Sequence, residues 1–190
     1  MEINTPIAED IRVTDQNSQY DAACRRLLSD KTILAWIMKS CLAEYRNCDI
    51  KEIAEKYIEG TPQVHEVPVM PDETNAAKIR GVSNVDASRT EGTVIYDIRF
   101  LAVAPSNGEL IQLIVNVEAQ GQFYVGYPLI MRAIYYCSRM ISAQYGTEFV
   151  HEEYQNIKKV YSVFICMDPP KNRRNSITRY RLTEENLVGN

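Results

Sequence analysis

Apolar side chains recur at every third or fourth position over about residues 29–45, which predicts an amphipathic helix there. These positions form a single stripe: Ile33, Leu34, Ile37, Met38, Cys41, Leu42 and Tyr45. A second helix is expected over about 50–59, because Asp49 suits its N-cap and Gly60 suits its end. The first twenty residues are polar, and we expect them to be loosely ordered.

Residues 61–92 are rich in Pro, Asn, Asp and Thr, and this composition predicts a long loop with one short strand at about 64–69. Two apolar strands are expected next, at Thr93–Val103 and Leu110–Ala119. The Ser-Asn-Gly between them is a turn signal, so the two strands should form a hairpin.

A third helix is predicted over about 127–144, with Pro128 in its first turn and Gly146 just past its end. An apolar strand follows at Val160–Met167. The expected order is therefore helix, hairpin, helix and strand, and no internal repeat interrupts it.

Composition agrees with one globular domain, because the 190 residues are 45% apolar and 24% charged. No apolar run approaches the ~20 residues that cross a bilayer, and the N-terminus is unlike a signal peptide, so we expect a cytoplasmic protein without a membrane partner. The five cysteines lack zinc-site spacing, and we expect them to be reduced and mostly buried. The net charge is −4, yet residues 158–181 hold seven Lys or Arg and one acid, Asp168.

The predicted hairpin brings acidic side chains together. Depending on which peptide bond of Ser-Asn-Gly lies at the centre of the turn, Asp97 faces either Asn116 or Glu118. In both registers these three residues and Gln120 share one face of the sheet, since side chains alternate with period two. Asp97 and Glu118 are then within ~8 Å of each other. A turn with an odd residue at its centre would place them on opposite faces.

Two carboxylates side by side on a sheet repel each other, and burial raises that cost unless a cation lies between them. A hard divalent ion fits this arrangement, because Mg²⁺ needs only one or two carboxylates, with water and phosphate oxygens completing its shell. The alternative is that one acid faces solvent at a strand end, or pairs with Arg99 or Arg132.

An Asp on one strand, a hairpin and Glu-x-Gln on the next strand resemble the PD-(D/E)XK nucleases; the motif stands here as YDIRF and NVEAQ. The continuation QGQFYVGYPLIMRAIYYCSRMISAQ resembles the branch with Gln in the third position, the recombination-promoting nucleases and PD-(D/E)XK family transposases of bacteria. Their following helix bears an Arg and paired Tyr, here Arg132, Tyr135 and Tyr136. LSDKTILAWIMK also resembles the first helix of that branch, and the resemblance covers roughly Leu27–Met167.

The resemblance implies an α/β (α+β) fold with a restriction-endonuclease-like core, in which a central mixed β-sheet is flanked by helices. This nuclease-like domain would occupy residues 27–182, after a loosely ordered segment 1–26 and before a tail 183–190. The abrupt end of the tail suggests a piece of a longer chain. The implied activity is a Mg²⁺-dependent endodeoxyribonuclease acting on DNA, and a homo-oligomer is a further expectation.

Residue by residue, the resemblance implies that Asp97 and Glu118 hold Mg²⁺ or Mn²⁺, with the carbonyl of Ala119 as a further ligand. Bound there, the metal would polarise the scissile phosphate and activate a water. Relatives with Lys in the third position have a cation beside that water, whereas Gln120 orients it through an uncharged amide. Asp30 is implied as a helix-borne acid that reaches the metal through water; it suits an N-cap equally well.

Basic and aromatic residues complete the expected nucleic-acid contacts. Arg132 and Tyr136 share one face of the third predicted helix, where they could bind phosphates or simply form a solvated or sheet-packing face. Lys171, Arg173 and Arg174 follow two prolines and are typical of a contact to the phosphate backbone, although a solvated tail explains them as well.

Two alternatives remain at this stage. Glu44 is a second acid on the first predicted helix, less suited to a metal site because it lies off the apolar stripe. The chain could also be a catalytically inactive nuclease-like domain that binds DNA or another protein, a reading favoured slightly by the net acidity and by the neutral Gln120.

Overall fold

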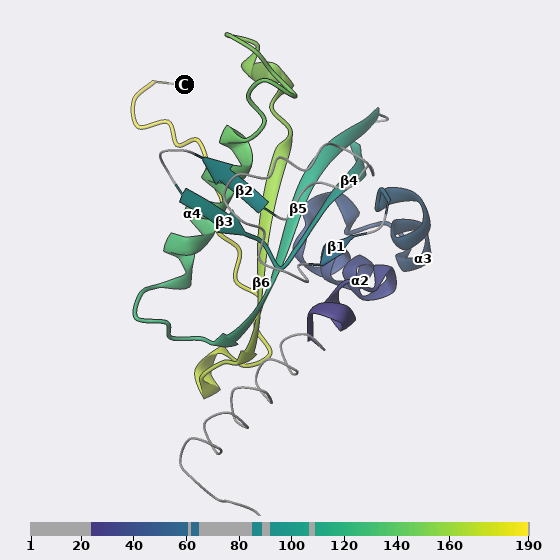
Figure 1. Ribbon diagram of the computed structural model, residues 1–190, viewed down its shortest axis with the longest axis vertical. Coiled ribbons are helices and arrows are strands. Elements are labelled where there is room, and N and C mark those ends of the chain that lie inside the picture. Colours follow the sequence, from purple (N-terminus) through teal and green to yellow (C-terminus); the bar gives the residue numbers. More distant parts are fainter. Residues whose placement is uncertain (1–23, 61, 65–84, 89–91, 107–108, 190) are drawn as a thin grey trace, which may run out of the picture.

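A four-stranded mixed sheet lies at the centre of the molecule (Figure 1), with strands in the order β1 (Gln63–Val64), β4 (Ile98–Ser106), β5 (Glu109–Gln122) and β6 (Lys159–Asp168). The first three are antiparallel neighbours, and β5 and β6 are parallel. This arrangement confirms a mixed α/β class with helices against a mixed sheet. The structure is a computed structural model that describes residues 24–60, 62–64, 85–88, 92–106 and 109–189.

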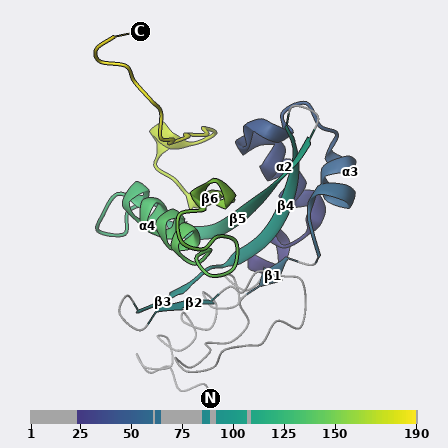
Figure 2. The ribbon, with the colours of Figure 1, turned by 90° about the horizontal axis from the view of Figure 1, so that it is seen from above.

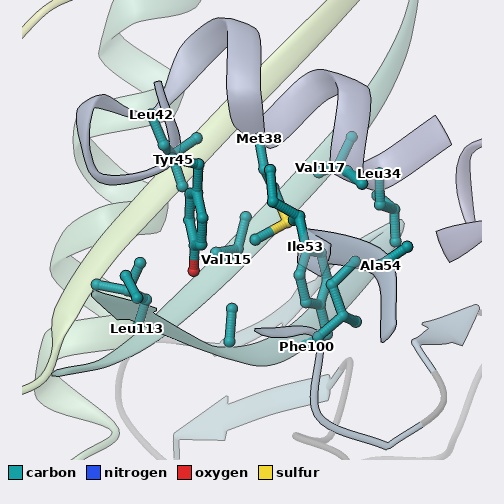
Figure 3. Packing of buried hydrophobic residues seen from close by; sticks show 14 of the residues in the cluster. Leu34, Met38, Leu42, Tyr45, Ile53, Ala54, Phe100, Leu113, Val115 and Val117 are labelled. Atoms are coloured by element: carbon teal, nitrogen blue, oxygen red, sulfur yellow. The ribbon is translucent and has the colours of Figure 1, made fainter. Parts of the chain in front are cut away.

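One face of the sheet is covered by α2 (Lys31–Cys41), the short helix η1 (Ala43–Tyr45) and α3 (Ile50–Glu52). Their apolar side chains meet the β4 and β5 residues that point to this face (Figure 3). The fully buried members of this core include Leu34, Met38, Leu42, Tyr45, Ile53, Phe100, Leu113 and Val115. The apolar stripe predicted for residues 29–45 is therefore the face that α2 and η1 bury.

The opposite face is covered by α4 (Leu129–Ser142), which connects β5 to the parallel strand β6. Figure 2 shows α4 on one side of the strand layer and α2 and α3 on the other. Met140 of α4 packs with Ile114 of β5, with Tyr96, and with Val94 of the small hairpin β2 (Val85–Ser88) and β3 (Gly92–Ile95). A short 3₁₀ turn, η3 (Tyr154–Asn156), precedes β6, and another, η4 (Lys171–Arg173), follows it.

The strand predicted as Thr93–Val103 is not continuous. It divides into β3 and β4, with Tyr96 and Asp97 between them. At the break the Asp97 side chain accepts a hydrogen bond of 2.9 Å from the main-chain N–H of Ala119. A side-chain acceptor thus takes the role of a ladder carbonyl, which the pattern of apolar residues did not indicate.

The long loop expected over 61–92 contains the strand β2. β1 occupies 63–64 and shares only residue 64 with the strand predicted at 64–69; residues 65–84 lie outside the described part of the chain. The helix expected over 50–59 is shorter and changes character, since α3 continues as the π-helix η2 (Ile53–Tyr57). Its predicted N-cap is confirmed: Asp49 accepts from the N–H groups of Lys51 and Glu52.

Other expectations fall partly within the described residues. Residues 24–28 are helical, so 24–26, the described part of the segment expected to be loosely ordered, have regular structure. All five cysteines are free. Only Cys24 is buried and the other four are half-buried, so fewer cysteines are buried than we predicted. Within the described ranges, no helix has the length and apolar character that a bilayer crossing requires. The tail 183–189 is exposed and forms neither helix nor strand.

Candidate metal centre

The register of the β4–β5 hairpin decides which residue Asp97 faces. Ile98 pairs with Val117 and Arg99 with Asn116, so the next position along places Asp97 opposite Glu118. Two hydrogen bonds tie this pair together: Glu118 Oε1 accepts from the Asp97 N–H at 3.2 Å, and Asp97 Oδ2 accepts from the Ala119 N–H. Of the two registers predicted from the turn, the second is therefore correct.

The predicted sharing of one face is confirmed for the three residues of β5. Asn116, Glu118 and Gln120 lie on the α4 side of β5, while Val115, Val117 and Ala119 pack on the α2 side. The Glu118 carboxyl group thus sits on the face covered by α4. Glu118 lies four residues before the end of β5, opposite Phe164 of the parallel strand β6, and so toward the carboxyl ends of these strands, where ligands bind in many α/β sheets.

Glu118 is buried, with only 7% of its surface exposed. Burial raises the pKa of its carboxyl group to about 7, and the negative charge of Asp97 adds to this increase. The Asp97 N–H, Asn116 and the charge of Arg132 act in the opposite direction. Glu118 is thus a carboxyl group whose proton is finely balanced at neutral pH, in a position where a second acid already lies alongside.

A cation not predicted from sequence approaches this pair. Arg25 Nη1 lies 3.8 Å from Asp97 Oδ1, and both side chains are about three-quarters buried. Arg25 belongs to the helical residues 24–28, which precede the first apolar stripe and carried no helical signal of their own. Arg25 therefore offsets part of the negative charge of Asp97.

Gln120 and Arg132 form one unit. Arg132 Nη1 donates to Gln120 Oε1 at 2.8 Å, and Gln120 Nε2 donates to the carbonyl of Gln122 at 2.7 Å. Arg132 is held from its other side by Tyr127, whose hydroxyl accepts from both Nε and Nη2 and whose ring lies 5.4 Å from the guanidinium carbon. Tyr127 was not singled out in the sequence, although its i, i+5 spacing to Arg132 brackets the start of α4.

Tyr136 lies beside the carboxylates. Its ring packs edge-on against Tyr96 at 5.3 Å and near Phe164 at 6.2 Å. Burial raises its pKa to about 12, and the charge of Glu118 contributes to that increase. The sheet-packing alternative considered for this helix face is therefore realised by the Tyr136 ring.

The two acids of the first helical region make other contacts. Asp30 is the N-cap of α2, where Oδ1 accepts from the N–H groups of Thr32 and Ile33 at 2.9 and 3.1 Å. Glu44 accepts hydrogen bonds from Lys159 and Tyr161, and Tyr161 packs against the core on the α2 side. Glu44 is thus separated from the carboxylate pair by the sheet itself.

Lys171, Arg173 and Arg174 are exposed in and after η4. They follow Asp168, which pairs in register with Gln122, so the basic turn lies at the same end of the sheet as the carboxylates. The structure therefore brings Asp97, Glu118, Ala119, Gln120, Arg132 and Tyr136 into one cluster, with the basic turn beyond it along the strands.

The donor set suits a hard divalent ion. Within the described ranges, no group of three or more His, Cys, Asp and Glu side chains is arranged around one point. Two carboxylates with main-chain oxygens are the kind of set that Mg²⁺ and Mn²⁺ accept when water and phosphate complete the shell, and are poor for a structural zinc site. In addition, Asn116 Oδ1 is a buried acceptor without a hydrogen-bond partner among the described residues.

Comparison of the chain with protein-family models, with curated proteins and with solved structures gave no match in any of the three.

Proposed function

We propose that this protein is a metal-dependent DNA endonuclease of the PD-(D/E)XK type, as in the transposase-associated branch that the sequence resembles. The observation that carries the proposal is the coupling of Asp97 to Glu118, a carboxyl group that is 7% exposed. Burying a carboxyl group beside a second acid, without a cation between them, costs free energy of folding. A site built to bind a divalent cation accounts for that cost.

In this account Asp97 and Glu118 hold Mg²⁺ or Mn²⁺, with the Ala119 carbonyl as a third protein ligand. The ion, when bound, would supply charge to polarise the scissile phosphate and to lower the pKa of the attacking water. Glu118 must release its proton before it can act as a ligand, and the Asp97 N–H and Arg132 favour the ionised form.

Arg132 supplies the fixed positive charge of the site. In lysine-containing relatives a cation stands at the third motif position, and here Gln120 instead holds a guanidinium 2.8 Å from its amide oxygen. A planar guanidinium fixed on two sides is suited to bind a phosphate and to stabilise negative charge as it develops. Gln120 is then a positioning residue for Arg132, a different role from orienting the water, because both ends of its amide are bonded within the protein.

DNA is the proposed substrate because the cations near the site are exposed and arranged along one end of the sheet. Lys171, Arg173 and Arg174 extend beyond the carboxylates in the direction of β5 and β6. Cations that follow a strand of phosphates provide affinity without sequence information.

Cleavage of supercoiled plasmid in the presence of Mg²⁺ tests the proposal. Wild type should convert the plasmid to nicked and linear forms, and EDTA, Asp97→Asn and Glu118→Gln should each abolish conversion. Glu153→Gln is the matched control, because Glu153 is an exposed acid whose side chain caps no helix. If the wild type leaves the plasmid intact with both Mg²⁺ and Mn²⁺, the enzymatic proposal fails.

A second candidate is a nuclease-like domain that binds DNA without cleaving it. It is favoured by one observation, namely that the amide of Gln120 is fully used by Arg132 and Gln122. This candidate would be supported over the enzyme if the protein binds plasmid in the presence of Mg²⁺ without nicking it. Arg132→Ala should then lose this binding.

A further inference from the structure

Beyond the carboxylate pair, a hollow of about 420 Å³ lies where β5 and β6 end side by side. This volume is within the roughly 300–1,000 Å³ of small-ligand sites, and is suited to one nucleotide rather than to a duplex. The hollow is lined by residues of both strand ends and of the basic turn: Gln122, Phe123, Tyr124, Asp168, Pro169, Pro170, Lys171 and Arg174.

The aromatic part of the hollow is unusually exposed. Tyr124 keeps 74% of its surface accessible and lies two residues past the end of β5. Phe123 packs edge-to-face against it, with ring centroids 5.0 Å apart. This contact restricts the Tyr124 ring without covering it, and a supported, exposed ring is the feature on which unpaired bases stack.

The cationic part of the hollow comes from Lys171 and Arg174. Arg174 is fixed over the turn by a hydrogen bond from Nε to the Pro169 carbonyl. Other cations of the basic C-terminal segment are engaged elsewhere: Lys158 with Glu148, and Lys159 with Glu44. Over the part of the chain that is described, no carboxylate pairs with Lys171 or Arg174, so their charge remains available to an anion.

We propose that this hollow binds one unpaired nucleotide of a DNA strand, with the base stacked on Tyr124 and a phosphate bound by Lys171 and Arg174. Asp168, the one acid in the lining, repels phosphate but accepts hydrogen bonds from an exocyclic amino group of a base. The ring and the acceptor thus match a base, and the two cations match its phosphate.

That the bound nucleic acid is DNA rests on the proposed function. The nucleotide site in turn restricts the kind of DNA that the enzyme would cleave. Gln122 is four residues beyond Glu118 on the same face of β5. The two positions are about 13 Å apart, the rise of about four nucleotides in one strand of a B-form duplex. The preferred substrate is therefore DNA with a single-stranded segment or an unpaired end a few nucleotides from the bond at the carboxylates.

Binding in EDTA, measured by fluorescence anisotropy, tests this inference without requiring cleavage. The probes are a single-stranded DNA of about twelve nucleotides, within the span that single-strand sites cover, its blunt duplex, and an RNA of the same sequence. The variants are Tyr124→Ala, Tyr124→Phe and the double variant Lys171→Ala with Arg174→Ala. Tyr154→Ala is the matched control, because Tyr154 is 63% exposed, packs on Phe149 in a similar way, and lies before β6 at the opposite end of that strand.

Tyr124→Ala should lower single-strand affinity by about tenfold, while Tyr124→Phe, which keeps the ring, and Tyr154→Ala should leave it within about twofold. Duplex affinity should change by less than about twofold in all three variants. The double cation variant should reduce the slope of log affinity against log salt for the single strand by about 0.7, because the two cations bind one phosphate.

Unchanged single-strand affinity in Tyr124→Ala, or an equal loss for the duplex, overturns the inference. Tighter binding of the RNA overturns DNA as the ligand. If the pattern is as expected but plasmid is never cleaved, the nucleotide site stands and the proposed enzymatic function fails.

Discussion

Glu118 accepts a hydrogen bond from the main chain of Asp97, the residue directly opposite it in the hairpin, at 3.2 Å. Asp97 in turn accepts from Ala119, so each acid is held by the backbone of the other strand. The side chains of both acids are fixed before any ligand arrives. Such preorganisation is what a metal site on strands provides and a flexible loop does not.

Glu118→Gln should make stability less dependent on pH. The pKa of Glu118 is raised from 4.5 to about 7, so the folded protein retains a proton that the unfolded chain releases. The stabilisation is therefore present at low pH and is lost as pH rises from about 5 through 7. Relative to wild type, the variant should gain up to about 3 kcal/mol in free energy of unfolding between pH 5 and pH 8.

Urea unfolding at the two pH values measures this difference. Mg²⁺ should restore stability to the wild type at the higher pH and have no effect on Glu118→Gln. Parallel pH dependences for wild type and variant would show that Glu118 does not carry the buried proton.

Asp97→Ala and Asp97→Asn should separate structure from chemistry. Alanine leaves the Ala119 N–H without its acceptor and should cost about 1–3 kcal/mol of stability. Asparagine keeps an acceptor oxygen and should cost less than about 1 kcal/mol. Both should abolish Mg²⁺-dependent cleavage. Cleavage by a stably folded Asp97→Asn protein is the outcome that contradicts a ligand role for this carboxylate.

Arg132→Ala should lower the cleavage rate by about 100-fold, the scale of losing one preorganised donor to a developing charge. Gln120→Ala should lower it less, and the double variant should be no slower than Arg132→Ala, because Gln120 acts through Arg132. Arg132→Lys should not restore the rate, since a point charge cannot reproduce the guanidinium geometry. Single-turnover rates measure these effects, and strictly additive losses would contradict the coupling of the two residues.

Asp30→Ser tests the acid that caps α2. Serine preserves an N-cap acceptor but removes the carboxylate, so stability should fall by less than about 0.5 kcal/mol and cleavage should be unchanged. Asp30→Ala should cost about 1 kcal/mol, again without slowing cleavage. A large loss of cleavage in Asp30→Ser with an unchanged melting temperature would instead support the metal-linked role implied by the resemblance.

Much of the fold followed from apolar periodicity and turn chemistry. The stripe from Ile33 to Tyr45 predicted the face that α2 buries, and Ser-Asn-Gly predicted the β4–β5 hairpin. Strand parity then placed Glu118 and Gln120 on the face of Asp97, because alternation along a strand is independent of tertiary context. These predictions depend only on local geometry.

The features that the sequence did not predict depend on contacts between segments far apart in the chain. The break at Asp97 is stabilised by an N–H of Ala119, twenty-two residues later, and apolar periodicity carries no sign of it. Arg25 approaches Asp97 across seventy-two positions, from residues without a helical signal. The holding of Arg132 by Gln120 likewise depends on how α4 lies over β5, which the spacing of these residues does not specify.

The central claim is that Asp97 and Glu118 together hold a divalent cation. The most direct measurement is anomalous diffraction from a crystal soaked with Mn²⁺ at about pH 8, above the pKa of Glu118, where both carboxylates are ionised. The account predicts an anomalous peak within ligand distance of both carboxylates, absent from Glu118→Gln crystals. A fully soaked wild-type crystal with no peak between Asp97 and Glu118 would contradict it.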